Sequence, residues 1–202
     1  MSFFAQLADF AIGVFKAYGA VGVFLVMLLE LVFPPIPSEV VLPLVGYMVW
    51  KTGGSYANAL FYVLVACLGH LTGAVALYAL GLKGGKALVL KYGRYVGIGE
   101  EEYRKGERFF EKYGREAILF SNFVPGMRSI TPLLAGVFKA DVFTLVVYTA
   151  LGAGTWNVIF VTLGFFLAPY GEEVALSAEK ASLWLLVFAV IGFAVIALLK
   201  YR

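Results

Sequence analysis

The chain has 202 residues, of which 61% are hydrophobic and only 14% are charged, and its mean hydropathy is +0.88. A soluble domain of this length could not bury so many apolar side chains in one core, so the composition indicates an all-α polytopic membrane protein with a single membrane domain over residues 1–202. The 16 basic and 13 acidic residues are too evenly balanced for a nucleic-acid surface, and a single cysteine, Cys67, excludes an internal disulfide.

The first apolar stretch, residues 20–50, is interrupted near its centre by three prolines, Pro34, Pro35 and Pro37. Each arm of about 13 residues reaches only ~20 Å, which is too short to cross a hydrocarbon core of ~30 Å. Proline removes a backbone donor and disfavours helix at the residue before it, so the break predicts a turn between two half-helices, with Ser38 as the N-cap of the second. We therefore expect a re-entrant helical hairpin over residues 20–50. Residues 3–18, before it, fit either a crossing or an interfacial helix.

Residues 57–80 are long and apolar enough to span a bilayer as one helix. Gly69 and Gly73 form a small-xxx-small pattern, which permits close packing either against a neighbouring protomer of a homo-oligomer or against another helix of the same chain. His70, the only histidine, lies between them. A lone imidazole there is more typical of a packing residue than of a proton relay, and it offers no metal site.

A basic loop follows over residues 82–115, with nine lysines and arginines: Lys83, Lys86, Lys91, Arg94, Arg104, Lys105, Arg108, Lys112 and Arg115. The positive-inside rule places this loop, and with it the C-terminus, in the cytoplasm. Within the loop, residues 100–113 mix charged and aromatic side chains. This pattern predicts an amphipathic helix, which either lies on the membrane surface or presents an ordinary solvated face.

The second broken stretch, residues 115–137, is interrupted by Pro125 and Gly126, and Thr131-Pro132 predicts that a helix starts shortly afterwards. Long apolar segments follow at residues 142–168 and 181–199. A broken hairpin followed by a long span thus occurs twice. We therefore expect two re-entrant hairpins in an inverted repeat, together with about three full transmembrane helices and interfacial amphipathic helices. Unwound backbone at membrane depth requires surrounding protein or a water-filled cavity, so the two breaks predict a transport site.

Three charged side chains flank the breaks: Glu30, Glu39 and Arg128. Each costs roughly 2.5–3.5 kcal/mol inside an apolar segment, so pairing or function must account for it. An arginine beside half-helix N-termini suits a phosphate group, and a nearby carboxylate suits proton uptake. The alternative is an ion pair between Glu39 and Arg128 that joins the two hairpins, with Glu30 as a cap or interface residue. The sequence contains no GxSxG or HExxH motif, so we expect no enzyme activity, no metal and no cofactor.

The residues around both breaks carry a resemblance to a known family. Glu30 to Pro43, ELVFPPIPSEVVLP, closely resembles the first signature of the DedA family, whose shared region is also called the VTT or SNARE-associated domain. The stretch FVPGMR, which ends at Arg128, resembles the second signature, and Trp156-Asn157 also fits the family pattern. The resemblance implies two re-entrant hairpins and lipid translocation: bacterial relatives are implicated in returning undecaprenyl phosphate across the membrane, and eukaryotic relatives scramble phospholipids. It also implies functional importance for Glu39 and Arg128, and some relatives are described as proton-dependent.

Two positions depart from the family pattern: Asn122 stands where many relatives have a second arginine, and Lys51 where some have an acidic residue. We expect a cell-membrane lipid translocase, a flippase or scramblase of a phosphate-bearing lipid such as undecaprenyl phosphate or a phospholipid, with protons as a candidate coupling ion. Its expected translocation residues are Glu39, Arg128, Glu30 and Asn122. Two alternatives stay open: a proton-coupled transporter of small ions or cationic solutes, and a non-transporting scaffold whose basic loop recruits partners or anionic lipid.

Overall fold

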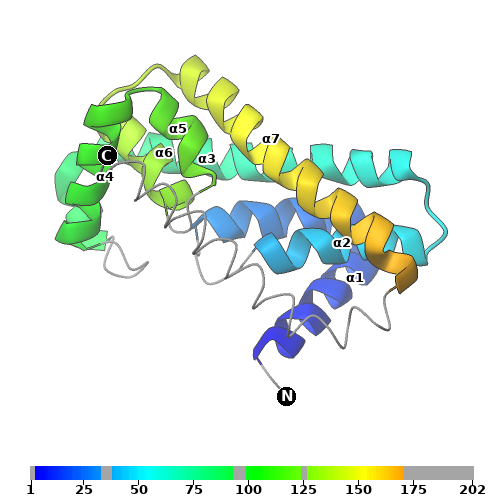
Figure 1. The fold of residues 1–202 in the computed structure, drawn as a ribbon. Helices are drawn as coiled ribbons and strands as arrows, with labels where there is room; N and C mark the ends of the chain where they lie inside the picture. Colours follow the sequence, from blue (N-terminus) through cyan, green and yellow to red (C-terminus); the bar gives the residue numbers. More distant parts are fainter. Residues whose placement is uncertain (1–2, 33–37, 93–98, 124–126, 171–202) are drawn as a thin grey trace, which may run out of the picture. The chain divides into compact units, whose positions relative to one another are not determined.

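The computed structural model describes residues 3–32, 38–92, 99–123 and 127–170, which form helices and short connections (Figure 1). The helices are α1 (Phe3–Val32), α2 (Ser38–Lys51), α3 (Tyr56–Tyr92), α4 (Glu100–Tyr113), α5 (Glu116–Ser121), α6 (Met127–Val137), α7 (Val142–Leu167) and the 3₁₀ turn η2 (Ala168–Tyr170). The site and its supporting contacts lie in one compact unit that ends at Phe166. The described residues are thus all-helical, as the composition predicts.

Three of the described helices are long and apolar enough to cross a membrane: Asp9–Leu31 in α1, Tyr56–Lys86 in α3 and Val142–Tyr170 in α7 and η2. The expected spans 57–80 and 142–168 are confirmed in length and composition, and the third, 181–199, lies outside the described residues. The first arm of the expected hairpin is longer than its prediction. Gly19 adopts a φ of +52°, so the helix bends there and continues back into residues 3–18 instead of ending.

The turns expected at the two hairpin tips lie outside the described residues, and these include Pro34, Pro35, Pro37, Pro125 and Gly126. The re-entrant hairpins and the inverted repeat therefore stay predictions. The helix after the first break does begin at Ser38, as expected.

The start predicted for the helix after the second break is wrong. Helix α6 begins at Met127, so Thr131 is not a cap and Pro132 lies inside the helix, as Pro43 lies inside α2. Each proline costs its helix one hydrogen bond, because it has no N–H to donate to the carbonyl four residues earlier. In α2 that carbonyl belongs to Glu39, and in α6 it belongs to Arg128.

Glycines bring α2 and α7 into backbone contact. A Cβ added to Gly46 would collide with the carbonyl of Val161, and one added to Gly164 would collide with the carbonyl of Pro43. The absence of side chains at these glycines is therefore what lets the two helices approach so closely.

A second reciprocal pair joins α6 to α3. A Cβ on Gly136 would collide with the carbonyl of Tyr78, and one on Gly81 would collide with the carbonyl of Leu133. Each helix that follows a break thus packs on the long helix of the other half of the chain.

The small-xxx-small pattern of α3 packs within the chain. Gly69 faces the carbonyl of Phe24 in α1, and a Cβ on Gly73 would lie 3.1 Å from the carbonyl oxygen of Leu28. Of the two partners left open by the sequence, the structure shows α1 of the same chain.

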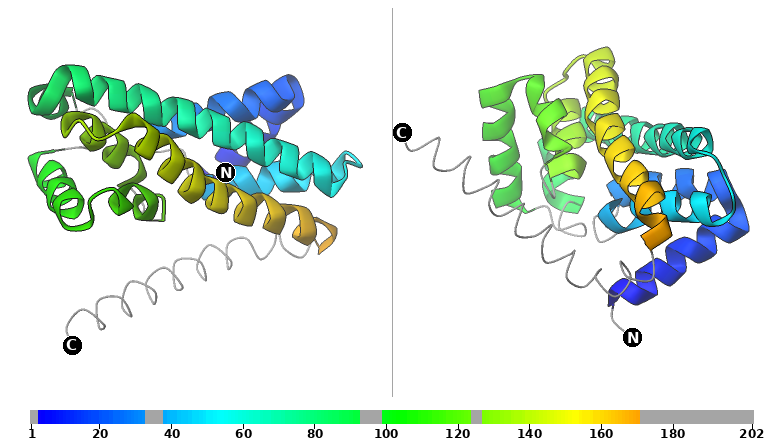
Figure 2. Two further views of the ribbon diagram at one scale, coloured as in Figure 1. Left: turned by 90° about the horizontal axis from the view of Figure 1, so that it is seen from above. Right: turned by 45° about the vertical axis from the view of Figure 1, so that its right-hand side comes forward.

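Helices α3 and α7 run antiparallel and side by side (Figure 2). Near the start of α3, the hydroxyls of Tyr56 and Thr162 lie 3.0 Å apart, and further along α3 the Tyr78 hydroxyl donates to the carbonyl of Ala140 at 2.7 Å. Hydrogen bonds thus link these two long helices at two separate points.

The amphipathic helix expected over residues 100–113 is present as α4. Its apolar face packs on α6: Tyr103 is 1% exposed, and Gly106 approaches the side chain of Leu134 closely. Its other face carries exposed ion pairs four residues apart, such as Arg104 with Glu100 at 2.9 Å. The helix therefore uses its apolar face to cover another helix of the same protein.

Candidate functional site

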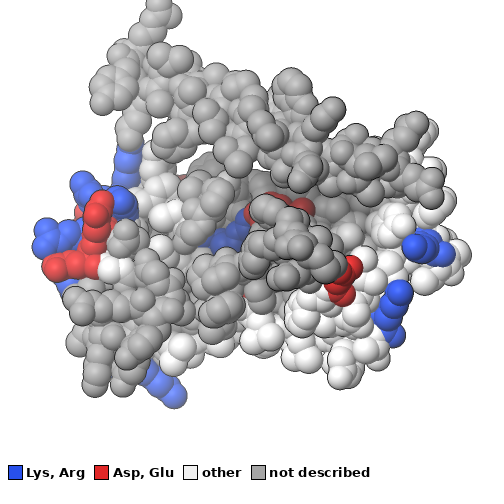
Figure 3. All heavy atoms as spheres, turned by 90° about the horizontal axis from the view of Figure 1, so that it is seen from below, with Lys and Arg blue, Asp and Glu red and all other residues white. Residues whose placement is uncertain are grey.

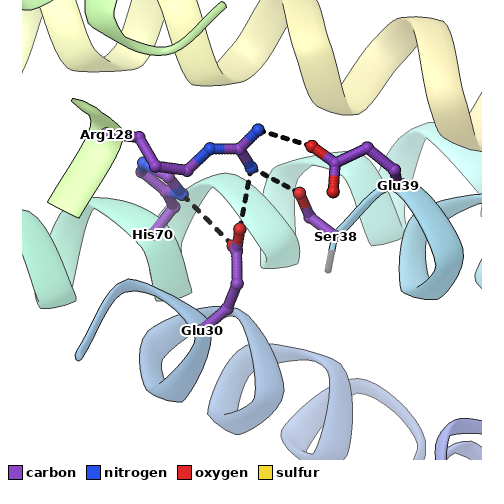
Figure 4. Close-up of polar contacts among 5 residues, drawn as sticks. All are labelled: Glu30, Ser38, Glu39, His70 and Arg128. Atoms are coloured by element: carbon purple, nitrogen blue, oxygen red, sulfur yellow. Dashed lines mark hydrogen bonds and ion pairs between the residues drawn. The ribbon is translucent and has the colours of Figure 1, made fainter. Parts of the chain in front are cut away.

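Arg128 is the centre of a buried polar cluster made by α1, α2, α3 and α6 (Figure 4). Its Nη1 donates to Oε1 of Glu30 at 2.7 Å and to the hydroxyl of Ser38, and its Nη2 donates to Oε1 of Glu39 at 2.7 Å. The imidazole Nδ1 of His70 lies 3.9 Å from Oε2 of Glu30, which is too long for a direct hydrogen bond. One guanidinium thus joins two carboxylates and a hydroxyl that lie on both sides of the first break.

The two carboxylates differ in their exposure to solvent. The side chain of Glu30 is 4% exposed and that of Arg128 is 9%, whereas that of Glu39 is 34%. Glu30 is therefore the interior anchor of the guanidinium, and Glu39 is its partner at the accessible edge. In Figure 3 a small group of acidic and basic side chains lies near the middle of the face, apart from the charged residues at its ends.

Trp156 of α7 forms one wall of the cluster. Its ring centroid lies 5.5 Å from the guanidinium carbon of Arg128, within the range of a cation–π contact. Phe123 packs edge-on to the indole at 5.8 Å between centroids, and Phe160 packs against it at 4.7 Å. The sequence indicated Trp156 only through the family pattern, since a lone aromatic residue in an apolar helix carries no signal of its own.

Several buried polar atoms in the described part of the chain have no hydrogen-bond partner. They are Oε2 of Glu30, Nε2 of His70, Oγ1 of Thr131, Oγ1 of Thr149 and Nε1 of Trp156. Buried polar groups are nearly always hydrogen-bonded, so the unpaired atoms of Glu30, His70 and Trp156 within the cluster mark places for water or a ligand.

The other residues singled out from the sequence lie as follows. Asn122 is buried at the end of α5, where its amide donates to the carbonyl of Ile118 at 2.8 Å, within its own helix. Lys51 lies at the exposed end of α2 and donates to the Tyr47 hydroxyl at 3.3 Å. Ser38 is the first residue of α2, where its hydroxyl accepts a hydrogen bond from Arg128.

The cluster offers the N–H donors of Arg128 to an anion and the carboxylate of Glu39 to a proton. No group of three or more His, Cys, Asp or Glu side chains that could hold a metal ion occurs among the described residues. Arginine binds carboxylates and phosphates through the same pair of N–H donors, so a phosphate and Glu39 would compete for the same side of the guanidinium.

Comparison with known proteins places these residues in a family context. Residues 36–166 match the model of the VTT domain. The chain is 35% identical to the membrane protein YbfM of Bacillus subtilis, over 73% of this chain and 89% of the relative. It is 31% identical to an alkaline phosphatase-like protein of Lactococcus lactis (84% and 80% covered) and 29% identical to undecaprenyl phosphate transporter A of Bacillus subtilis (77% and 75% covered). No solved structure matches the chain.

Proposed function

The chain belongs to the VTT domain family, and we propose that it moves a phosphate-bearing lipid between the two leaflets of a cell membrane. The observation that carries the proposal is the buried guanidinium of Arg128, which is held on one side by Glu30 and faces the more exposed Glu39 on the other. A relative named undecaprenyl phosphate transporter A supports a polyprenyl phosphate or a phospholipid as the substrate class.

The two ends of the guanidinium have different roles in this proposal. Nη1 stays on Glu30 and Ser38, which hold the arginine in place. Nη2, which now bonds Glu39, becomes the donor to a phosphate oxygen when the carboxylate of Glu39 moves away. The acyl or prenyl chain of the lipid stays in the bilayer while the headgroup passes the cluster.

Charge balance links this exchange to a proton. With both carboxylates ionised, Glu30, Glu39 and Arg128 together carry one net negative charge, and a second one in a low-dielectric site would be costly. If Glu39 takes up a proton as a singly charged phosphate replaces it on Arg128, the net charge does not change. We therefore propose that each headgroup enters together with one proton, and that the headgroup carries a single negative charge there.

The test uses purified protein in liposomes with a fluorescent phospholipid or a fluorescent polyprenyl phosphate, with and without a proton gradient. We expect the wild type to move headgroups between leaflets and Arg128→Gln and Glu39→Gln to abolish this movement while the protein stays folded. The matched controls are Arg108→Gln and Glu116→Gln, which neutralise exposed charges on α4 and α5. Unchanged movement in Arg128→Gln would refute the mechanism.

The net negative charge of the cluster favours one competing function, a proton-coupled transporter of a small cation that binds between Glu30 and Glu39. Flux of a soluble cation without any lipid movement would support it. Release of inorganic phosphate from the lipid would instead support a phosphatase, as the name of the Lactococcus lactis relative suggests for that protein. Folded protein that shows no lipid movement, no cation flux and no phosphate release would favour the third alternative, a non-transporting membrane scaffold.

A further inference from the structure

The indole N–H of Trp156 is a buried donor without an acceptor. Indole offers only this one hydrogen-bonding group, and a buried tryptophan nitrogen usually finds a partner. The aromatic contacts with Phe123 and Phe160 hold the ring in place. The unpaired N–H is therefore a fixed feature of the cluster.

The ring of Trp156 lies close enough to Arg128 for the indole N–H and the guanidinium to bind the same ligand. The guanidinium carbon lies 5.5 Å from the ring centroid. Two N–H donors can bond different oxygens of one phosphate when their nitrogens lie up to roughly 8 Å apart, since each N···O hydrogen bond takes about 2.9 Å. A phosphate beside both side chains is therefore within reach of donors on the guanidinium and on the indole.

Two further unpaired hydroxyls lie on the same two helices. Thr131 follows Arg128 by three residues in α6, and Thr149 precedes Trp156 by seven residues in α7. These spacings place each threonine on the same helical face as its partner in the cluster. Each of the two helices that supply Arg128 and Trp156 thus also carries an unpaired buried hydroxyl on that face.

We propose that Trp156 is a headgroup-binding residue, whose Nε1–H donates to an oxygen of the phosphate that pairs with Arg128. This inference rests on the proposed function and adds a neutral donor to it. Because the indole carries no charge, it strengthens phosphate binding without changing the charge balance of the cluster. The cation–π contact also keeps the guanidinium beside the indole.

The test measures binding in detergent micelles with farnesyl phosphate, with farnesol as the probe without phosphate and with inorganic phosphate as the probe without a lipid chain. Trp156→Phe keeps an aromatic ring and removes the N–H. We expect it to weaken farnesyl phosphate binding about ten- to a hundredfold, the usual range for a hydrogen bond to a charged group, and to leave farnesol binding unchanged. Trp50→Phe is the matched control, because Trp50 lies 41% exposed near the end of α2. Inorganic phosphate that binds as tightly as farnesyl phosphate would identify a free anion as the ligand and overturn the lipid assignment.

A second measurement leaves Trp156 in place, so it does not depend on whether Trp156→Phe folds. With Trp50 and Trp184 both replaced by phenylalanine, Trp156 is the only tryptophan, and its emission should shift with farnesyl phosphate but not with farnesol. No shift, or a Trp156→Phe protein that binds farnesyl phosphate like the wild type, would show that the indole N–H does not bond the phosphate and would overturn the inference. Lipid movement by that same variant would leave the proposed function standing, whereas a wild type that moves no lipid would refute the proposed function.

Discussion

Replacement of Glu30 by glutamine tests whether the two ion pairs of Arg128 have different roles. The pair with Glu30 is expected to stabilise the fold, and the pair with Glu39 is expected to open for the phosphate. Glu30 and Arg128 are both less than 10% exposed, and their atoms lie 2.7 Å apart. Removing one partner of such a buried pair costs about 3–5 kcal/mol. In Glu30→Gln the buried guanidinium keeps only the more exposed Glu39 as a carboxylate partner. Glu39 makes an equally short contact, but its side chain is 34% exposed, so its loss is expected to cost about 1 kcal/mol or less.

Thermal unfolding in detergent, followed by circular dichroism, measures this difference. For a chain of this size one kcal/mol corresponds to about 2–4 °C, so Glu30→Gln should lower the midpoint by roughly 6–20 °C and Glu39→Gln by less than roughly 4 °C. The double variant Glu30→Met with Arg128→Met should recover part of the loss, since it leaves no unpaired charge in the interior and only the more exposed Glu39 loses its partner. Equal shifts for Glu30→Gln and Glu39→Gln would refute the distinction between anchor and working carboxylate.

Two further predictions concern helix packing and capping. Gly164→Ala should destabilise the protein strongly, because its Cβ would collide with the backbone of Pro43; Gly154→Ala in the same helix is the control, since the nearest atom to its Cβ is 4.0 Å away. Yields of folded protein and thermal midpoints compare the two, and equal midpoints would contradict the close contact. Asp141 accepts hydrogen bonds from the backbone and hydroxyl of Thr144, which lower the pKa of its carboxyl group. Its contribution to stability should be complete at pH 7 and disappear as the pH falls through this lowered pKa, so the midpoints of wild type and Asp141→Ala should draw together as the pH falls from about 4 through the lowered pKa, which a pH series of melts would show.

The sequence predicted the helices well where a single physical cost decides the structure. Residues 57–80 and 142–168 are helical because no other structure satisfies their backbone in lipid, and 100–113 form a helix because charged and aromatic side chains alternate at helical spacing. The cost of a charge in an apolar segment also indicated Glu39 and Arg128, and the structure places them in contact although they lie 89 residues apart. The helix start predicted at Thr131-Pro132 was wrong, because a helix can lose the one hydrogen bond that proline removes and still continue through it.

Properties that depend on three-dimensional packing were not predictable from the sequence. Glu30, which was expected among the translocation residues with a cap or interface role as the alternative, is the more deeply buried of the two carboxylate partners of Arg128. Trp156 and His70 join the cluster because α7 and α3 pass beside it, and no local pattern around either residue indicates that. Hydropathy shows which segments are apolar, but not which side of each helix faces another helix.

The reciprocal glycine contacts have a consequence for the order of assembly during synthesis. Helix α2 docks against residues 161 and 164, which are translated more than a hundred residues after it. At about 5–20 residues per second, α2 waits on the order of ten seconds before its partner leaves the ribosome. In that interval lipid or an insertion factor has to cover its glycine face. The same arrangement means that a first half made alone would have nothing for α2 to dock on, whereas two half-chains produced together carry complementary surfaces and are expected to associate into one molecule.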